Sequence, residues 1–135
     1  MTDSLRSMVS KRARHRCEYC RLHEADLPRQ PFHLEHVIAR KHGGALALHN
    51  LAWSCQLCNL FKGSDLSGLD SQTGKVVRLF NPRRHRWGRH FAWKGPWVFG
   101  KTPIGRATVA VLRMNLPHRR QLRALLMQAG LFPSV

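Results

Sequence analysis

Apolar side chains recur at helical spacing over residues 4–14, with an Asp and a Ser at the start that suit a helix N-cap. The pattern predicts a short basic helix, which leads into the motif Cys17-Glu-Tyr-Cys20. Residues 22–31 carry few apolar side chains and two prolines, which is typical of a loop.

The middle of the chain combines two extended patterns with one helical pattern. Residues 32–38 and 50–54 are predicted strands, and the connection between them contains Gly43-Gly44. Residues 55–62 follow at helical spacing and stop before Gly63, so we expect a helix there. The predicted order is therefore strand, loop, strand, helix.

The second half alternates strands, turns and helices. A strand is predicted at 75–80 after a glycine-containing loop, and a short hairpin at 91–93 and 97–99. Helices are predicted at 105–114, behind a Thr-Pro start, and at 117–129, before a glycine. The last helix carries three leucines on one face: Leu122, Leu125 and Leu126. We expect this face to pack on the domain, with a dimer contact as the alternative.

This order of elements defines the expected fold class and domain organisation. We expect a small α+β fold in which residues 1–66 hold the N-terminal helix, the cysteine pairs and the strand, strand, helix core. Residues 67–135 form a C-terminal strand-helix extension packed on that core. A length of 135 residues suits a single compact domain overall.

The charge balance indicates a partner that is a polyanion. The chain has 23 Lys and Arg against 7 Asp and Glu, a formal net charge of +16, and its basic residues run along the whole length. Phosphate backbones attract such a surface through counterion release. The sequence shows neither an apolar leader nor a run of about 18 apolar residues, so we expect a cytoplasmic protein without a membrane span.

Two Cys-x-x-Cys pairs use all four cysteines of the chain. Cys17 and Cys20 are separated from Cys55 and Cys58 by 34 residues. Two residues between thiolates let both sulfurs reach one ion, and two such pairs complete a tetrahedral shell with bonds of about 2.3 Å. Because thiols stay reduced inside cells, we predict a structural zinc site; two disulfides or a redox Cys-x-x-Cys are the alternatives.

The residues between and around the cysteine pairs form a second pattern. In chain order it consists of His33-Leu-Glu35-His36, Gly43-Gly44, Asn50-Leu51, Cys58-Asn59 and Lys62-Gly63. Over residues 17–63 this pattern resembles the HNH endonuclease family. The resemblance implies a ββα-metal (His-Me finger) core and a nuclease function.

The resemblance also implies a role for each matching residue. His36 would be the general base that activates water, and Asn50 would fix the loop between the strands. Glu35 and Asn59 would hold one catalytic divalent ion, and oxygen ligands favour magnesium or manganese. Phosphodiester hydrolysis needs both the base and the ion. The base removes a proton from water, and the ion stabilises the phosphorane and the leaving oxygen.

Two positions depart from the common form of the family. Glu35 stands where Asp is common, and Asn59 stands where the family name implies His. Adjacent strand residues point to opposite faces, so the strand must bend or end where Glu35 and His36 meet if both are to reach one site. His33 lies on the side of Glu35 and is a further metal ligand, a phosphate contact or a surface histidine.

Several basic side chains are expected to contact nucleic acid. They are Lys62, Arg40, Lys41, Arg83, Arg84 and Arg86. Trp87, Trp93 and Trp97 lie among arginines, and tryptophans in such surroundings can stack on bases. More often such residues are buried, so we expect these three in the core.

The function expected from these features is metal-dependent hydrolysis of DNA phosphodiester bonds, most simply in double-stranded DNA. The protein would be a bacterial or phage enzyme that acts as a monomer or homodimer. The alternative is a zinc-stabilised nucleic-acid-binding module without catalysis, because the charge and the cysteines suit it equally well.

Overall fold

A computed structural model describes residues 2–133 of the chain. They form two compact units, each built from helices and short antiparallel strand pairs, so the predicted α+β class is confirmed. Unit 1 runs to Ser64 and includes Asn81–Arg84. Unit 2 consists of Asp65–Phe80 and the chain from His85 onward. Packing of the C-terminal extension on the core stays a prediction.

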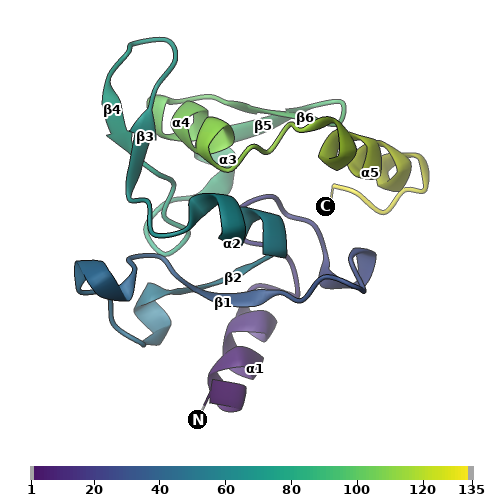
Figure 1. The fold of residues 1–135 in the computed structure, drawn as a ribbon. Coiled ribbons are helices and arrows are strands. Elements are labelled where there is room, and N and C mark those ends of the chain that lie inside the picture. Colours follow the sequence, from purple (N-terminus) through teal and green to yellow (C-terminus); the bar gives the residue numbers. More distant parts are fainter. Residues whose placement is uncertain (1, 134–135) are drawn as a thin grey trace. The chain divides into compact units, whose positions relative to one another are not determined.

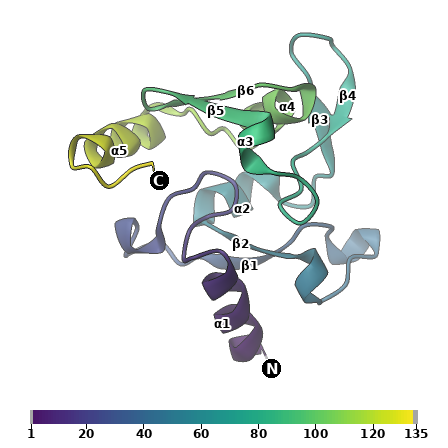
Figure 2. The same cartoon turned by 180° about the vertical axis from the view of Figure 1, so that it is seen from behind.

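Unit 1 is organised around one pair of strands. β1 (His33–His36) and β2 (Leu51–Ser54) are antiparallel, and helix α2 (Gln56–Lys62) follows β2 and contacts β1. This is the predicted order of strand, loop, strand and helix. Helix α1 (Thr2–Arg12) contacts β2, and α1 and α2 lie on opposite sides of the strand pair (Figures 1 and 2).

Two arginines of α1 attach this basic helix to the strand pair. The guanidinium of Arg12 donates to the carbonyl oxygens of Leu48 and Leu51 at 2.9 and 2.5 Å. That of Arg6 lies 4.9 Å from the ring centroid of Trp53 on β2. All four residues of β2 are buried, so these contacts fix α1 against the most apolar strand of the unit. Part of the positive charge of the chain therefore stabilises the fold of unit 1.

The strands of unit 2 form two further pairs. Among the described residues, β3 (Ser67–Leu69) pairs with β4 (Val76–Arg78), and β5 (Phe91–Lys94) pairs with β6 (Trp97–Gly100). The helices of this unit are α3 (Trp87–His90), α4 (Pro103–Val111) and α5 (Pro117–Gln128). Helix α4 contacts β3, β4 and β6, so it joins the two strand pairs (Figure 1).

The hairpin of β5 and β6 and the helices α4 and α5 are confirmed predictions, although α4 ends at Val111 and not at Met114. Strand β3 is a correction, because the segment around Gly68 was predicted as a loop. A Cβ atom at Gly68 would lie 2.6 Å from the Cγ2 atom of Val111. Glycine therefore allows the strand to approach α4 closely, and this packing leaves no alternating pattern in the sequence. Helix α3 is a second correction, since no helix was predicted between the strand at 75–80 and the hairpin that begins at residue 91.

The buried face of α5 differs from the predicted leucine face. Arg119 and Arg123 are the buried residues of this helix, whereas Leu125 is 64% exposed. The guanidinium of Arg119 donates to the carbonyl of Leu112 at 2.7 Å, and that of Arg123 donates to the carbonyl of Pro96 at 2.8 Å. The leucine face is thus only partly packed. No helix within residues 2–133 has the length and apolar character needed to cross a bilayer.

The tryptophans of unit 2 divide into a packed cluster and one exposed ring. The ring of Trp87 lies 5.0 Å from that of Phe91 and 5.3 Å from that of Trp93, and Trp93 meets Phe132 at 4.9 Å. Trp87 and Trp93 are half-buried and pack against other aromatic rings, so the predicted core role holds only in part for these two. It is wrong for Trp97, which is 48% exposed.

Candidate metal centre and active site

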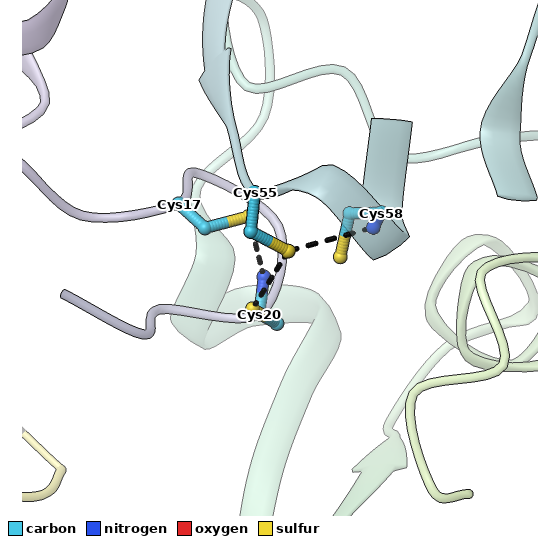
Figure 3. Close-up of side chains that lie close together, drawn as sticks. All are labelled: Cys17, Cys20, Cys55 and Cys58. Carbon is cyan, nitrogen blue, oxygen red and sulfur yellow. Dashed lines mark hydrogen bonds between the residues drawn. The ribbon is translucent and has the colours of Figure 1, made fainter. Parts of the chain in front are cut away.

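The four cysteines converge on one point in unit 1. Cys17 and Cys20 come from the loop after α1, and Cys55 and Cys58 come from the start of α2 (Figure 3). All four are buried, their sulfur atoms lie within 4.8 Å of one another, and none is in a disulfide. The sulfurs of Cys20 and Cys55 are 3.7 Å apart. A tetrahedron with bonds of about 2.3 Å has edges of about 3.8 Å, so this spacing suits a single ion.

Backbone amides donate hydrogen bonds to two of these sulfurs. The amide of Cys20 donates to the sulfur of Cys17, and that of Cys58 donates to the sulfur of Cys55, both at 3.4 Å. Hydrogen bonds among the thiols raise the pKa of Cys55, and burial raises that of Cys58. Without a cation the cluster stays protonated, whereas a bound divalent ion removes the thiol protons. Four buried thiols positioned in this way to bind a metal ion are consistent with structural zinc.

Glu18, inside the first cysteine pair, attaches this loop to the rest of unit 1. Its carboxylate accepts a hydrogen bond from the backbone amide of Trp53 at 2.8 Å and pairs with the guanidinium of Arg83. Glu18 is 7% exposed. No role for Glu18 follows from the sequence, in which its position between the two cysteines is the only signal. Arg83, predicted to contact phosphate, is an ion-pair partner in the structure.

Asn50 fixes the loop between β1 and β2. Its side-chain oxygen accepts from the amide of Ile38 at 2.9 Å, and its side-chain nitrogen donates to the carbonyls of Ile38 and Ala45, each at 2.9 Å. A Cβ atom at Gly44 would lie 1.6 Å from the carbonyl oxygen of Ile38, so only glycine fits beside this network. The loop of the Gly43-Gly44 motif is thus closed by one buried amide immediately behind the end of β1.

Glu35 lies in the interior of unit 1 at 3% exposure. One carboxylate oxygen accepts from the ammonium of Lys62 at 2.8 Å, and the other accepts from the hydroxyl of Tyr19. Lys62 is 2% exposed and also donates to the carbonyl of Val37 at 2.9 Å. Burial raises the pKa of Glu35, and the neighbouring ammonium opposes this rise. The structure therefore places Lys62, predicted to contact phosphate, in a buried ion pair that joins α2 to β1.

Replacing Lys62 by Met is expected to lower the free energy of unfolding by about 3–5 kcal/mol, because Glu35 loses its buried counterion. Denaturant unfolding at neutral pH measures this loss. The control Lys41→Met removes an exposed lysine and should change the unfolding free energy by less than about 0.5 kcal/mol. The double variant Glu35→Gln with Lys62→Met should recover part of the loss, since no buried charge remains. Equal stability of Lys62→Met and the wild type would contradict the ion pair.

His36 is the last residue of β1 and lies opposite Leu51 of β2. Glu35 and His36 are both paired residues of β1, and the strand ends immediately after His36, so a common site for their two side chains stays a prediction. The side chain of His36 is partly exposed, but its Nε2 atom is buried and has no hydrogen-bond partner among residues 2–133. Burial, followed by the charge of Arg40, lowers the pKa of His36. A neutral imidazole with one unsatisfied nitrogen can accept a proton from a water molecule that reaches that buried atom.

The other two candidate metal ligands, Asn59 and His33, are only half-buried. Asn59 is half-buried on α2, three residues before Lys62 and therefore on the same side of the helix. His33 is half-buried at the start of β1, opposite Ser54. Within residues 2–133 the four cysteines are the one group of three or more His, Cys, Asp or Glu side chains spaced for a metal.

The four remaining predicted phosphate contacts lie on the surface. Arg40 and Lys41 are exposed on a short helical turn between β1 and β2, and Arg84 and Arg86 are exposed in the segment before α3. These four side chains are free to meet a polyanion, in contrast to Lys62 and Arg83. The positive surface near the end of β1 is therefore supplied by the loop that Asn50 closes.

Residues 17–65 match the family model described as HNH endonuclease. The resemblance found in the sequence is therefore confirmed for this segment. Proteins of this family are in general nucleases that act on DNA. No curated protein and no solved structure matches the chain significantly. The matched segment contains both cysteine pairs, His36, Asn50 and Asn59, and it lies almost wholly in unit 1.

Proposed function

We propose that this protein is a metal-dependent endonuclease that hydrolyses DNA phosphodiester bonds. The observation that carries the proposal is the buried, unsatisfied Nε2 atom of His36 at the end of β1, within a segment that matches the HNH family. A net charge of +16 supplies the attraction to the phosphate backbone.

In this proposal His36 accepts a proton from a water molecule that attacks the phosphorus atom. The lowered pKa of His36 keeps the imidazole neutral, which is the form that acts as a base. Asn50 holds the backbone at Ile38, two residues after His36, and thereby limits movement of the strand end. Arg40 and Lys41, on the loop that follows, position the phosphate through charge.

A divalent ion would be held by Glu35 and Asn59, as the family resemblance implies. The carboxylate of Glu35 uses one acceptor position on each oxygen, and an ionised carboxylate has about four, so it retains capacity for a hard cation such as magnesium or manganese. When bound, such an ion stabilises the negative charge of the phosphorane and the leaving oxygen. His33 is a third candidate ligand on the same strand.

The experiment that tests this function is nicking of supercoiled plasmid DNA by the zinc-loaded protein with added magnesium or manganese. Cleavage that requires the added ion supports the proposal. The second candidate is a zinc-stabilised binding module, which is favoured by the pairing of both carboxylate oxygens of Glu35 with groups of the chain itself, Lys62 and Tyr19. Tight binding of the plasmid without cleavage under any divalent ion would establish that module and exclude the nuclease.

The pH dependence of cleavage provides a second measurement. The pKa of His36 is lowered, so its imidazole becomes neutral below the ordinary value of about 6.5. The single-turnover rate should therefore rise with pH through a midpoint below that value and then level off. A cation on the adjacent Glu35 shifts the midpoint in the same direction, because positive charge disfavours the protonated ring. A midpoint clearly above the ordinary value would contradict His36 as the base.

A further inference from the structure

The outer face of β6 in unit 2 exposes two aromatic rings at alternate positions. Trp97 is 48% exposed and Phe99 is 46% exposed, while Val98 between them is 2% exposed. Side chains alternate along a strand, so the two rings share one face and Val98 points to the other. Lys94 is directly opposite Trp97 on β5 and lies on that same face.

These rings line a groove on the surface of unit 2. The groove has a volume of about 600 Å³ and is lined by Lys94, Trp97, Val98, Phe99 and Asn115. Such a volume falls within the range of about 300–1,000 Å³ found for ligand sites, and this groove is open to solvent. A planar ring the size of a nucleobase can therefore enter it.

The free edge of β6 is closed by a side chain. The side chain of Asn115 accepts from the amide of Val98 at 3.0 Å and donates to its carbonyl at 2.7 Å. The guanidinium of Arg120 donates to the carbonyl of Asn115 at 2.9 Å and lies 3.9 Å from the ring centroid of Trp97. The strand edge is thus closed to a further strand, and the indole is held in one orientation with a positive charge against it.

The charge around the groove indicates what could occupy it. Residues 71–135 contain no Asp or Glu, whereas they contain thirteen of the 23 Lys and Arg residues of the chain. Asp70 is fully buried and paired with Arg106. The groove therefore combines two exposed aromatic rings with a wholly basic surrounding sequence, which suits a ligand with planar rings on an anionic backbone.

We propose that Trp97 and Phe99 form a stacking platform for unpaired bases of single-stranded nucleic acid. Lys94 and Arg120 neutralise the backbone, and the two rings stack on neighbouring bases. The platform extends the proposed nuclease function by a second contact with nucleic acid, made at single-stranded or opened regions. Its test measures binding alone and needs no cleavage.

The test uses the full-length, zinc-loaded protein with His36→Ala, without added magnesium or manganese, so that cleavage is suppressed. Fluorescence anisotropy measures binding of a labelled single-stranded oligothymidylate at fixed salt. Trp97→Leu and Phe99→Leu keep an apolar side chain but remove the ring, and each should weaken binding roughly tenfold. Trp97→Phe and Phe99→Trp keep a ring and should bind within a fewfold of the parent. Val76→Ala, on the exposed face of β4, is the control and should bind as the parent does.

Two further measurements separate stacking from simple charge and from a structural effect. The leucine variants should bind a duplex as tightly as the parent, because paired bases are not available for stacking. Lys94→Gln should reduce the slope of log binding constant against log salt by about 0.7, whereas Trp97→Leu should leave that slope unchanged.

Undiminished binding of the single strand by both leucine variants would overturn the platform and favour a protein partner for the aromatic face. An equal loss for single strand and duplex would overturn it as well, because that result indicates a structural effect. If plasmid nicking fails while the leucine variants still lose single-strand binding, the nuclease proposal falls and the platform stands. If plasmid nicking succeeds while the leucine variants keep full single-strand binding, only the platform proposal falls.

Discussion

Substitution of His36 by Ala is expected to reduce metal-dependent nicking of plasmid DNA by about 10²–10⁴-fold, the contribution typical of a positioned general acid or base. The buried Nε2 atom of His36 has no hydrogen-bond partner within unit 1, so the alanine variant loses a proton acceptor without breaking an internal hydrogen bond. The loss should appear in the rate of the chemical step, measured under single-turnover conditions with magnesium or manganese.

The appropriate control for this variant is His42→Ala, which removes an exposed histidine from the same loop region. Both variants should melt near the wild-type temperature and bind uncut DNA with unchanged affinity, because neither ring makes a hydrogen bond within residues 2–133. Wild-type cleavage by His36→Ala would remove the histidine from the mechanism. Equal losses in His36→Ala and His42→Ala would show that the effect is not specific to the end of β1.

The path from β1 to α2 could be predicted from the sequence because each of its boundaries has a local cause. The cysteine side chain at position 55 caps α2 by accepting a hydrogen bond from the amide of Cys58, and Gly63 follows the helix at a positive φ of 51°. Gly44 is required by the close approach of the carbonyl of Ile38. At these positions the backbone conformation restricts which residue types are possible. The residues that carry the family resemblance are therefore also the ones that mark the ends of the helix and the turn.

The partners of the buried charges could not be predicted in the same way. Lys62 and Glu35 are 27 residues apart, and Arg83 and Glu18 are 65 residues apart. In the sequence, Lys62 and Arg83 are two more basic residues in a chain of net charge +16, which suggests phosphate contact. Only the folded chain shows that a buried acid lies beside each of them, and a buried charge needs such a partner.

The exposed face of β6 marks a third limit of sequence reasoning. Trp93 and Trp97 have similar neighbours in the sequence, and both were predicted to be buried. Trp93 faces Phe132 and is partly covered by the guanidinium of Arg123, whereas Trp97 lies on the opposite face of the hairpin. A short two-stranded hairpin has one packed face and one open face, and the sequence alone did not show which face each tryptophan takes.

Substitution of Cys55 by Ser is expected to abolish stable metal binding and to unfold unit 1 at physiological temperature. Structural zinc contributes an apparent binding free energy of about 10–16 kcal/mol in small zinc domains, which equals or exceeds the total stability of about 5–15 kcal/mol of most domains. Cys55 also caps α2, so its loss affects both the ion and the helix that carries Asn59 and Lys62. Metal content per chain and thermal melting followed by circular dichroism measure the two effects.

The control for Cys55→Ser is Ser54→Ala, at the neighbouring buried position. The hydroxyl of Ser54 donates one hydrogen bond to the carbonyl of Cys55 at 3.1 Å, so its removal should cost about 1 kcal/mol and leave the metal content at one zinc per chain. Chelation of zinc from the wild type should reproduce the melting behaviour of Cys55→Ser, because both treatments remove the same link between the loop of residues 17–20 and α2. A Cys55→Ser protein that retains one zinc and melts with the wild type would show that the four sulfurs do not hold the ion.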